Sequence, residues 1–448
     1  MSQQNPAISK GIDWLLVWLY IILVSIGIAA IFATTYREGD SIVQGFLSLK
    51  TDYSKQALFF IIAGVLAIFI LLTDSKFFTA TANISYAIGM VLLLLVFPFH
   101  TEIMGTKSII RFGSSFQLQP AELCKVFVNL ALAKYLSRIE TDFNKPKAQL
   151  IAIAIAIVPA LITIAQSETG LALVYFSFFL VMYREGLPAM YLVVGFSVAV
   201  LVVATLLIEP NLLAIILTAL AILTIYFLRR QIKRRRELLF IIVSIWGVCV
   251  GIQRFAVPYV FENVLKPYQV KRIYDTIGKE YVPKDEAAKA EIDKQTKGKK
   301  KEDGNYNVRQ SKIAIGSGGF LGKGLLSGTQ TRYDFVPEQR TDFIFCTIGE
   351  GFGFIGSTIL LGIYFLMLMR IVTIAERQRS VFSRCYAYGV AAVLFFHVAI
   401  NICMTIGLAP VIGIPLPFIS YGGTALLTFT MLLFILIRLD ADRQMVLR

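Results

Sequence analysis

The chain has 448 residues, of which 56% are hydrophobic and only 16% are charged, and its mean hydropathy is +0.70. Because a soluble protein carries charge on about a quarter of its residues, this composition excludes an ordinary soluble domain and predicts a polytopic membrane protein. The net charge of +14 is expected from basic loops beside anionic lipid, so nucleic acid is not expected as a partner. Five cysteines without paired spacing and only two histidines predict neither a disulfide framework nor a His-rich metal site.

Apolar runs long enough to cross a bilayer follow one another along most of the chain. A transmembrane helix needs about 20 apolar residues, and by that measure we expect an all-α polytopic membrane protein with about twelve transmembrane helices. The first run is too long for the apolar core of a signal peptide and is expected to remain as a span. The expected spans are residues 13–34, 56–73, 78–98, 120–137, 149–166, 170–183, 188–208, 211–228, 238–256, 342–372, 384–405 and 418–438.

The distribution of basic residues predicts which side of the membrane each loop faces. The short loops LRRQIKRRRE and RQRSVFSR are rich in arginine, whereas the loops IEPN and GLAPVIGIPLP contain no lysine or arginine. The positive-inside rule therefore places both termini in the cytoplasm. It divides the chain into an N-terminal membrane bundle of about nine spans (1–256), one large extracytoplasmic loop (257–341) with a charged insertion near 284–304, and a C-terminal bundle of about three spans (342–448).

Ionisable groups inside apolar runs are costly, and they are therefore candidates for a functional site. Glu122 and Lys125 stand three residues apart on one face of an expected helix, within pairing distance. Two interpretations remain open: an ion pair at the membrane interface, or a polar cavity that receives a charged group of a substrate. Glu168, at the outer end of an expected span, belongs either to such a site or to a solvated loop.

Two stretches combine glycine with a break in the apolar pattern. Residues 407–423 place three prolines between the last two expected spans. Irregular backbone at membrane depth needs protein or a water-filled cavity around it, so we expect a re-entrant segment that lines a site. The other stretch, IGSGGFLGKG (315–324), has neither the Walker spacing nor the context of a dinucleotide fingerprint. Its glycines either let the backbone approach a ligand closely or form a string of turns.

Four segments, in order along the chain, match the motifs of one known family. They are LQPAELCK, QSETG, the long outer-loop stretch NVRQSKIAIGSGGFLGKGLLSGTQTRYDFVPEQRTDFIF, and GLAPVIGIPLPFISYGG near the C-terminus. With them the chain resembles the SEDS (FtsW/RodA/SpoVE) family of bacterial cell-wall polymerases, most closely its RodA branch. Such proteins usually have ten spans, so the resemblance makes this chain an enlarged member, with the additional spans within 188–256.

The resemblance implies a peptidoglycan glycosyltransferase in the bacterial plasma (inner) membrane. It would polymerise lipid II, a disaccharide-pentapeptide on undecaprenyl diphosphate, into glycan strands during cell elongation, with inversion at the anomeric carbon, and so control cell shape. The implied partners are a class B penicillin-binding protein transpeptidase and other membrane proteins of the elongation complex. A divalent cation (Mg²⁺ or Mn²⁺) at the diphosphate would suit the chemistry, although no ligand cluster in the sequence requires one.

The candidate catalytic base is a carboxylate of the charged insertion. The family's Asp-Pro position aligns with Lys300 or with Val282-Pro283, and neither is an acid. Asp303 and Asp285 are the nearest replacements, and Asp303 is preferred because it lies closer to the ordered motif. The alternative for either aspartate is an ordinary solvated carboxylate.

Cations are expected to stabilise the diphosphate as it leaves. Lys125, Lys312 and Arg340 are the candidates, and Lys107 is expected to supply charge where Ser108 and Ile109 replace the family's Arg and Trp. For Glu338 and Arg340 the alternative is a structural ion pair that holds the loop to the bundle. The expected substrate-binding residues are Glu122, Lys125, Lys107, Glu168, Gln310, Ser311, Lys312, Glu338, Arg340, Ser420 and Tyr421.

Two functions of other classes compete with polymerisation. A lipid II flippase would also use charges inside the membrane, and a non-catalytic scaffold would only bind a penicillin-binding protein. A flippase needs charges through the full depth of the membrane, whereas the few charges in the spans gather toward the outer half. The sequence therefore favours chemistry at the outer leaflet.

Overall fold

The computed structural model describes residues 11–37, 41–47, 49–103, 106–112, 116–265, 267, 270, 274, 306–409 and 411–443. The chain divides into two compact units: residues 1–187 together with 306–448, called the first unit here, and residues 188–305, called the second unit. Both candidates for the catalytic base, Asp303 and Asp285, lie outside the described residues.

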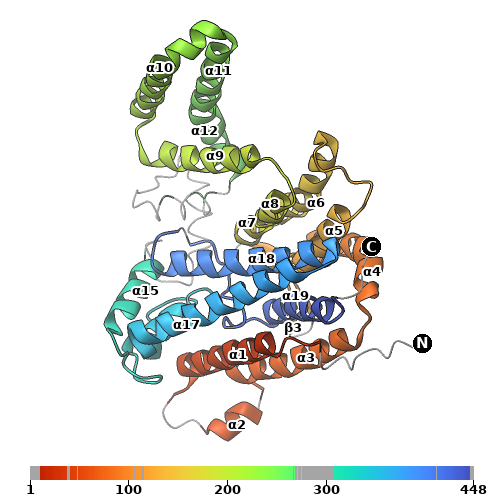
Figure 1. Ribbon diagram of the computed structural model, residues 1–448. Coiled ribbons are helices and arrows are strands. Elements are labelled where there is room, and N and C mark those ends of the chain that lie inside the picture. The colour runs from red at the N-terminus through yellow and green to blue at the C-terminus, as the bar shows by residue number, and fades with distance from the viewer. Residues whose placement is uncertain are drawn as a thin grey trace, which may run out of the picture. The chain divides into compact units, whose positions relative to one another are not determined.

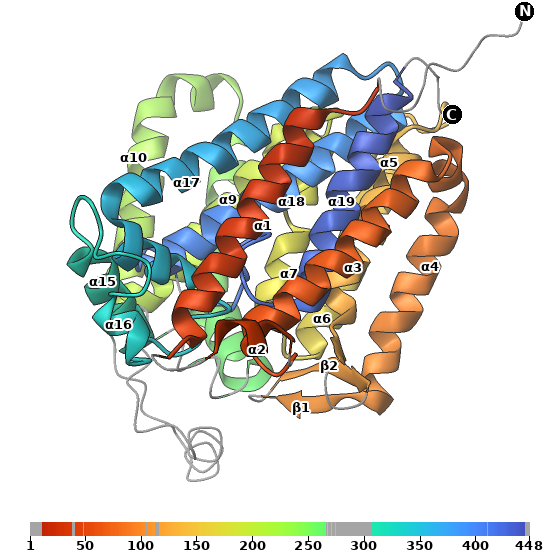
Figure 2. The same cartoon turned by 90° about the horizontal axis from the view of Figure 1, so that it is seen from below.

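The first unit is a bundle of long apolar helices (Figures 1 and 2). Its centre is formed by α5, α18 and α19, whose buried side chains belong to one continuous hydrophobic core. About three quarters of the apolar window of α19 (78%) is buried inside the protein, which makes it the central helix. The helices are α1 (Trp14–Thr35), α2 (Ile42–Leu47), α3 (Asp52–Leu72), α4 (Ser75–Phe99), α5 (Pro120–Leu136), α6 (Pro146–Ala165), α7 (Thr169–Tyr175), α8 (Phe178–Arg184), α15 (Tyr306–Ser317), α16 (Thr329–Arg332), α17 (Ile344–Arg377), α18 (Val381–Thr405) and α19 (Gly423–Ala441).

A small antiparallel sheet joins α4 to α5, and the all-α expectation did not include it. Its strands, β1 (Thr101–Ile103), β2 (Thr106–Phe112) and β3 (Phe116–Leu118), pair in the order β1-β2-β3. The polar and β-branched residues of GTKSIIRFG suit a short hairpin better than a helix. Figure 2 shows β1 and β2 at the same end of the first unit as α2 and α16.

The second unit consists of three apolar segments. They are α9 (Ala189–Leu207), α10 (Pro210–Arg234) and a long segment in which α11 (Glu237–Gly251) continues through η2 (Ile252–Ala256), α12 (Val257–Tyr259) and η3 (Val260–Val264). The side chains of Trp246 and Gln253 donate hydrogen bonds across to α10, to the Thr218 hydroxyl (3.2 Å) and the Pro210 carbonyl (2.5 Å). The helix thus runs past residue 256, where the sequence placed the end of the bundle.

Ten helices of the described residues are long and apolar enough, by length and composition, to cross a membrane, against the expected count of about twelve. Two of the expected spans, 120–137 and 170–183, form helices that are too short to be among these ten. The first forms α5, which has 17 residues and carries Glu122 and Lys125. The second is divided into the short helices α7 and α8. The chain is an all-helical polytopic membrane protein apart from the small sheet.

Residues 411–422, called the buried segment below, connect α18 to α19 without helical structure. Ile414, Leu416, Phe418 and Ile419 are each at most 2% exposed, so the segment runs inside the bundle. Gly27, in the interior of α1, packs directly against it: a Cβ at Gly27 would stand 2.7 Å from the Cα of Ile419. Irregular backbone is therefore covered by protein, as membrane depth demands.

This contact predicts that Gly27→Ala destabilises the protein, since the nearest atoms are backbone and cannot rotate away. Overpacking of this kind costs about 1–3 kcal/mol. Gly64→Ala in α3 is the matched control, because a Cβ there meets nothing within 4 Å. Thermal unfolding of detergent-purified protein should show a lower midpoint for Gly27→Ala and an unchanged or slightly higher one for Gly64→Ala. Equal midpoints would contradict the close contact.

Candidate functional site

A chain of polar groups crosses the core of the first unit. Pro120 opens α5, and the helix places Glu122 and Lys125 on one face, with 2.6 Å between Glu122 Oε2 and Lys125 Nζ. Lys125 Nζ also lies 2.8 Å from Nε2 of His397 on α18, and His397 Nδ1 lies 3.1 Å from the carbonyl oxygen of Pro415 in the buried segment. Lys125 and His397 are 0% exposed. The predicted Glu122–Lys125 pair therefore exists, but it is enclosed rather than placed at the interface.

Phe429 of α19 packs against both Lys125 and His397. Its ring meets His397 edge-on, with 4.8 Å between the ring centroids, and Lys125 Nζ lies 5.3 Å from the Phe429 centroid. Such contacts stabilise a cation that has lost its water. Lys125 is thus fully engaged by protein groups, and it is not presented to a substrate at the outer face.

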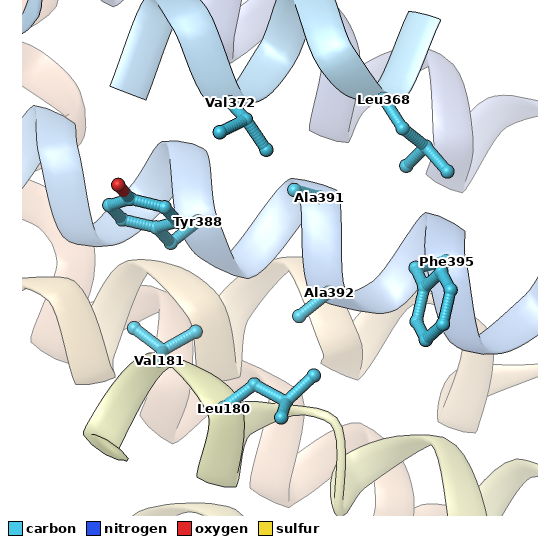
Figure 3. A pocket seen from close by; sticks show the side chains of 8 residues that line it. All are labelled: Leu180, Val181, Leu368, Val372, Tyr388, Ala391, Ala392 and Phe395. Atoms are coloured by element: carbon cyan, nitrogen blue, oxygen red, sulfur yellow. The ribbon is translucent and has the colours of Figure 1, made fainter. Parts of the chain in front are cut away.

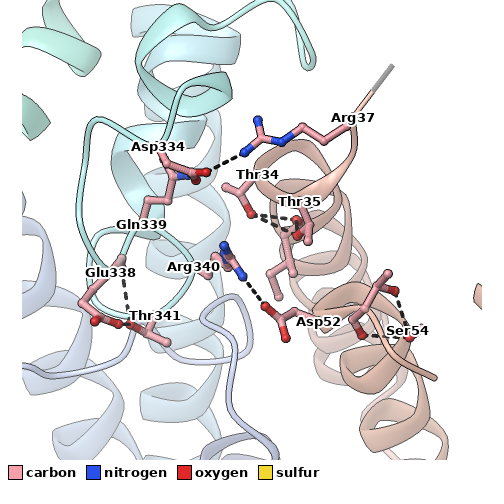
Figure 4. Close-up of polar contacts among 12 residues, drawn as sticks. Thr34, Thr35, Arg37, Asp52, Ser54, Asp334, Glu338, Gln339, Arg340 and Thr341 are labelled. Atoms are coloured by element: carbon pink, nitrogen blue, oxygen red, sulfur yellow. Dashed lines mark hydrogen bonds and ion pairs between the residues drawn. The ribbon is translucent and has the colours of Figure 1, made fainter. Parts of the chain in front are cut away.

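A second group of expected residues meets where α3 begins, as Figure 4 shows. Arg340 Nη1 pairs with Asp52 Oδ2 at 2.5 Å, and the Arg340 carbonyl accepts a 2.9 Å bond from the Tyr421 N–H. The Ser420 hydroxyl donates to the carbonyl of Thr341 at 2.5 Å. Arg340 therefore holds the loop to α3 through Asp52, where the sequence suggested Glu338 as its partner.

Two further features constrain the backbone of the loop beside Arg340. Thr341 donates its hydroxyl to the Glu338 carbonyl (3.3 Å), and Glu338 has a φ of +54°, a conformation that side-chain-bearing residues adopt rarely.

The helix α15 carries three further expected residues to the end of α18. Ser311 is buried and donates its hydroxyl to the carbonyl of Thr405 at 2.9 Å, which makes it structural. Lys312 is exposed, and its ammonium lies beside Gly407: a Cβ at Gly407 would stand 2.5 Å from Lys312 Nζ. Gln310 is half-buried on the same helix. Lys312 is thus an accessible cation beside the entry to the buried segment.

Glu168 and the small sheet meet the buried segment from another side. The Ser108 hydroxyl donates to Glu168 Oε1 at 2.6 Å, and Gly170 packs against the carbonyl of Ile412 in the buried segment. Lys107 lies in β2, and its side chain is outside the described part of the structure. Glu168 is therefore hydrogen-bonded to the sheet and is not an ordinary solvated loop carboxylate.

Glu350, on α17, is a buried carboxylate that our sequence reasoning missed. It is 0% exposed and accepts bonds from Lys323 Nζ (3.0 Å), the backbone N–H groups of Gln330 (3.0 Å) and Thr331 (2.8 Å), and the Thr331 hydroxyl (2.7 Å). An acid inside an expected span was the available signal, as it was for Glu122. Glu350 anchors the loop that follows α15.

The glycines of this loop allow its backbone to lie against α17. A Cβ at Gly318 would stand 2.0 Å from the Gly349 carbonyl oxygen, and one at Gly322 would stand 2.2 Å from that of Gly351. Gly328 approaches the Glu350 carboxylate in the same way, at 2.6 Å from Oε2. For these glycines the close approach is to the protein's own helix.

Two apolar hollows lie in the first unit. One, of about 480 Å³, is lined by Ser25, Ile28, Ala29, Phe32, Phe46 and Leu325, and so lies between α1, α2 and the loop. The other, of about 230 Å³, lies between α8, α17 and α18 (Figure 3), and the hydroxyl of Tyr388 that borders it is bonded to Glu376. The second hollow carries no group suited to catalysis.

Among the described residues, no three His, Cys, Asp or Glu side chains come together as metal ligands. The polar groups of the site instead surround the buried segment: Lys125 and His397 on one side, Glu168 on another, Lys312 at its beginning and Arg340 at its end. An enclosed carboxylate–lysine pair behind this segment and partly exposed cations beside its ends are the arrangement of a polytopic membrane protein with a polar site at one end of its bundle.

Comparison with known proteins agrees with this class. The sequence matches the FtsW/RodA/SpoVE family of cell cycle proteins over residues 13–209 and 189–445, and the chain belongs to that family. Peptidoglycan glycosyltransferase RodA of Treponema pallidum is 28% identical over 93% of this chain and 94% of its own length. Peptidoglycan glycosyltransferase MrdB of Escherichia coli K12 is 31% identical over 80% of this chain and 78% of its own length.

Solved structures show the same fold. A chain from the structure titled "Structural coordination of polymerization and crosslinking by a peptidoglycan synthase complex" matches with a TM-score of 0.63 and 22% identity, over 96% of this chain and 98% of that one. The crystal structure of Thermus thermophilus rod shape determining protein RodA matches with a TM-score of 0.58 and 22% identity, over 97% of this chain and 98% of that one. At such identities the likeness establishes the fold.

The bonds of Glu350 predict that Glu350→Gln loosens the loop. Removing one partner of a buried charge pair costs about 3–5 kcal/mol, and the retained amide should reduce that loss. Glu376→Gln is the control, because Glu376 pairs with Arg184 in an exposed position (55% and 50%), where an ion pair contributes little to stability. Limited proteolysis should cut within 318–331 faster in Glu350→Gln only. Equal cleavage in both variants would show that Glu350 is not the anchor.

Proposed function

We propose that this chain is a peptidoglycan glycosyltransferase that polymerises lipid II into glycan strands during cell elongation and so controls cell shape. The observation that carries the proposal is the match with a peptidoglycan glycosyltransferase over nearly the full length of both chains. The geometry supports it, because residues from the other three motifs gather around the buried segment, which is part of the fourth.

The orientation follows from the distribution of arginine. Gly11 lies against Ala441, so the described ends of the chain share one end of the first unit. Arginines of α8, α17, α18 and α19 form ion pairs at that end: Arg184, Arg370, Arg377, Arg384 and Arg438. The positive-inside rule supports a cytoplasmic position for this end. With α5 and the α7–α8 pair proposed as additional crossings, twelve spans would put both termini inside and the loop before α17 outside.

In the proposed reaction, the 4-hydroxyl of one sugar attacks the anomeric carbon of the other and the lipid diphosphate leaves. A carboxylate of the charged insertion, Asp303 or Asp285, would accept the proton of that hydroxyl. Lys312 and Arg340, both partly exposed beside the buried segment, would stabilise the charge that develops on the diphosphate. Lys125 is enclosed, so it is withdrawn from this role and assigned to organising the site.

The apolar hollow between α1, α2 and Leu325 suits the hydrocarbon tail of such a substrate. Arg37, which follows the end of α1, pairs with Asp334 at 2.5 Å (Figure 4). No step is assigned to a divalent cation, because the described residues offer no cluster of ligands.

A flippase is disfavoured by the same geometry. Transport of a charged headgroup needs a polar path through the membrane, whereas the Glu122–Lys125–His397 chain is enclosed on the described sides. For the partner we propose a class B penicillin-binding protein transpeptidase, within a larger elongation complex. The fold likeness to a chain of a peptidoglycan synthase complex supports this choice.

Purified protein with its transpeptidase partner should convert labelled lipid II into glycan strands. Asp303→Ala should lower the rate by about 10²-fold or more if Asp303 is the base, as loss of a general base does. Asp285→Ala is the second candidate, and Asp293→Ala is the control from the same insertion. Wild-type activity in both candidate variants would reject the choice of base, and absence of strands from wild type would reject polymerisation.

The orientation is tested by labelling single cysteines in a cysteine-free variant. A membrane-impermeant maleimide should label Tyr333→Cys from outside intact cells, because Tyr333 is 65% exposed in the outer loop. Arg379→Cys, in the exposed turn between α17 and α18, should react only after the cytosol is opened. The reverse pattern would overturn the topology.

A further inference from the structure

His397 is a buried histidine that no motif singled out. It is 0% exposed on α18 and stands between two groups from other parts of the fold, the ammonium of Lys125 and the carbonyl of Pro415. Both of its ring nitrogens are engaged, at 2.8 and 3.1 Å. Buried polar groups need hydrogen-bond partners, and both partners of His397 come from other elements, α5 and the buried segment, so this side chain connects the two.

The partners decide which nitrogen carries the proton. A carbonyl oxygen only accepts, so Nδ1 of His397 donates to Pro415. Nε2 is then free to accept, and the Lys125 ammonium donates to it while also pairing with Glu122 Oε2. The result is a directed chain, in which Glu122 forms an ion pair with Lys125, Lys125 donates to His397, and His397 donates to Pro415.

The chain continues along the buried segment toward the outer face. The N–H of Leu416 donates to the Ser420 hydroxyl at 2.8 Å, and that hydroxyl donates to the Thr341 carbonyl at 2.5 Å. The next residue, Tyr421, donates its N–H to the carbonyl of Arg340. Residues 415–421 are thus held at one end by His397 and at the other by the loop that carries Arg340.

We propose that His397 is a positioning residue of the polymerase: it ties the Glu122–Lys125 pair to Pro415 and thereby sets the position of the buried segment against Arg340 and Thr341. This inference rests on the proposed function. His397 touches no reacting atom, and it acts through the backbone of the segment. Its role should therefore appear in the rate of the chemical step more than in the affinity for lipid II.

The test compares three variants in the polymerisation assay with the transpeptidase partner. His397→Leu removes both hydrogen bonds and should lower kcat about tenfold or more with little change in KM. His397→Gln offers one acceptor and one donor and should recover kcat to within about threefold of wild type. Leu394→Ala, at a buried position of the same helix outside the hydrogen-bonded chain, should lower the unfolding midpoint through a cavity and leave kcat near that of wild type.

Any one of three results would overturn this inference and leave the proposed function intact. The first is a kcat of His397→Leu within about twofold of wild type, and the second is a kcat of His397→Gln no higher than that of His397→Leu. The third is a Leu394→Ala variant that loses as much kcat as His397→Leu when both variants lose equally in unfolding midpoint. Absence of glycan strands from the wild-type complex would instead remove the proposed function, and this inference with it.

Discussion

The backbone of the buried segment must satisfy its polar groups inside an apolar bundle, where bulk water does not reach. Pro415 and Pro417 prevent a helix from doing so within itself. Side chains of other helices supply the bonds instead: Asn401 to Ile414 (2.7 Å), Tyr364 to Pro417 (2.5 Å), Gln56 to Ser420 (3.3 Å) and His397 to Pro415 (3.1 Å). Because these donors come from α3, α17 and α18, the segment forms only when the whole first unit is assembled.

Two buried carboxylates, Glu122 and Glu350, each hold a different part of the site in place. Glu122 is neutralised by Lys125 in the core, and Glu350 by Lys323 beneath the outer loop. In each case a lysine and further polar contacts offset the cost of burying a charge. The arginines behave differently: Arg37 and Arg340 pair with Asp334 and Asp52 in partly exposed positions. Exposed pairs contribute little to stability, so these cations can exchange partners with an anionic substrate at small cost.

Particular residues show how far sequence reasoning reached. Glu122 and Lys125 were predicted to pair from their spacing, since a helix places positions i and i+3 side by side. Their third partner could not be predicted, because His397 lies 272 positions away and joins them through the packing of α18 on α5. Glu350 was visible as an acid in an apolar run and was overlooked, and the six donors around its carboxylate depend on how the loop folds back. The hairpin β1–β2 was not predicted, because it occupies a short polar stretch between two expected spans.

The sequence by itself determined the class of molecule: its hydropathy demands a membrane bundle, and its ordered motifs define the family, because both depend on residue type and local spacing alone. Only the tertiary structure decided the role of each polar residue. It enclosed Lys125, left Lys312 at the surface, paired Arg340 with Asp52, and packed Gly318, Gly322 and Gly328 against α17. The physical reason is that burial and hydrogen-bond partners are set by helices that meet in space after long separation in the chain.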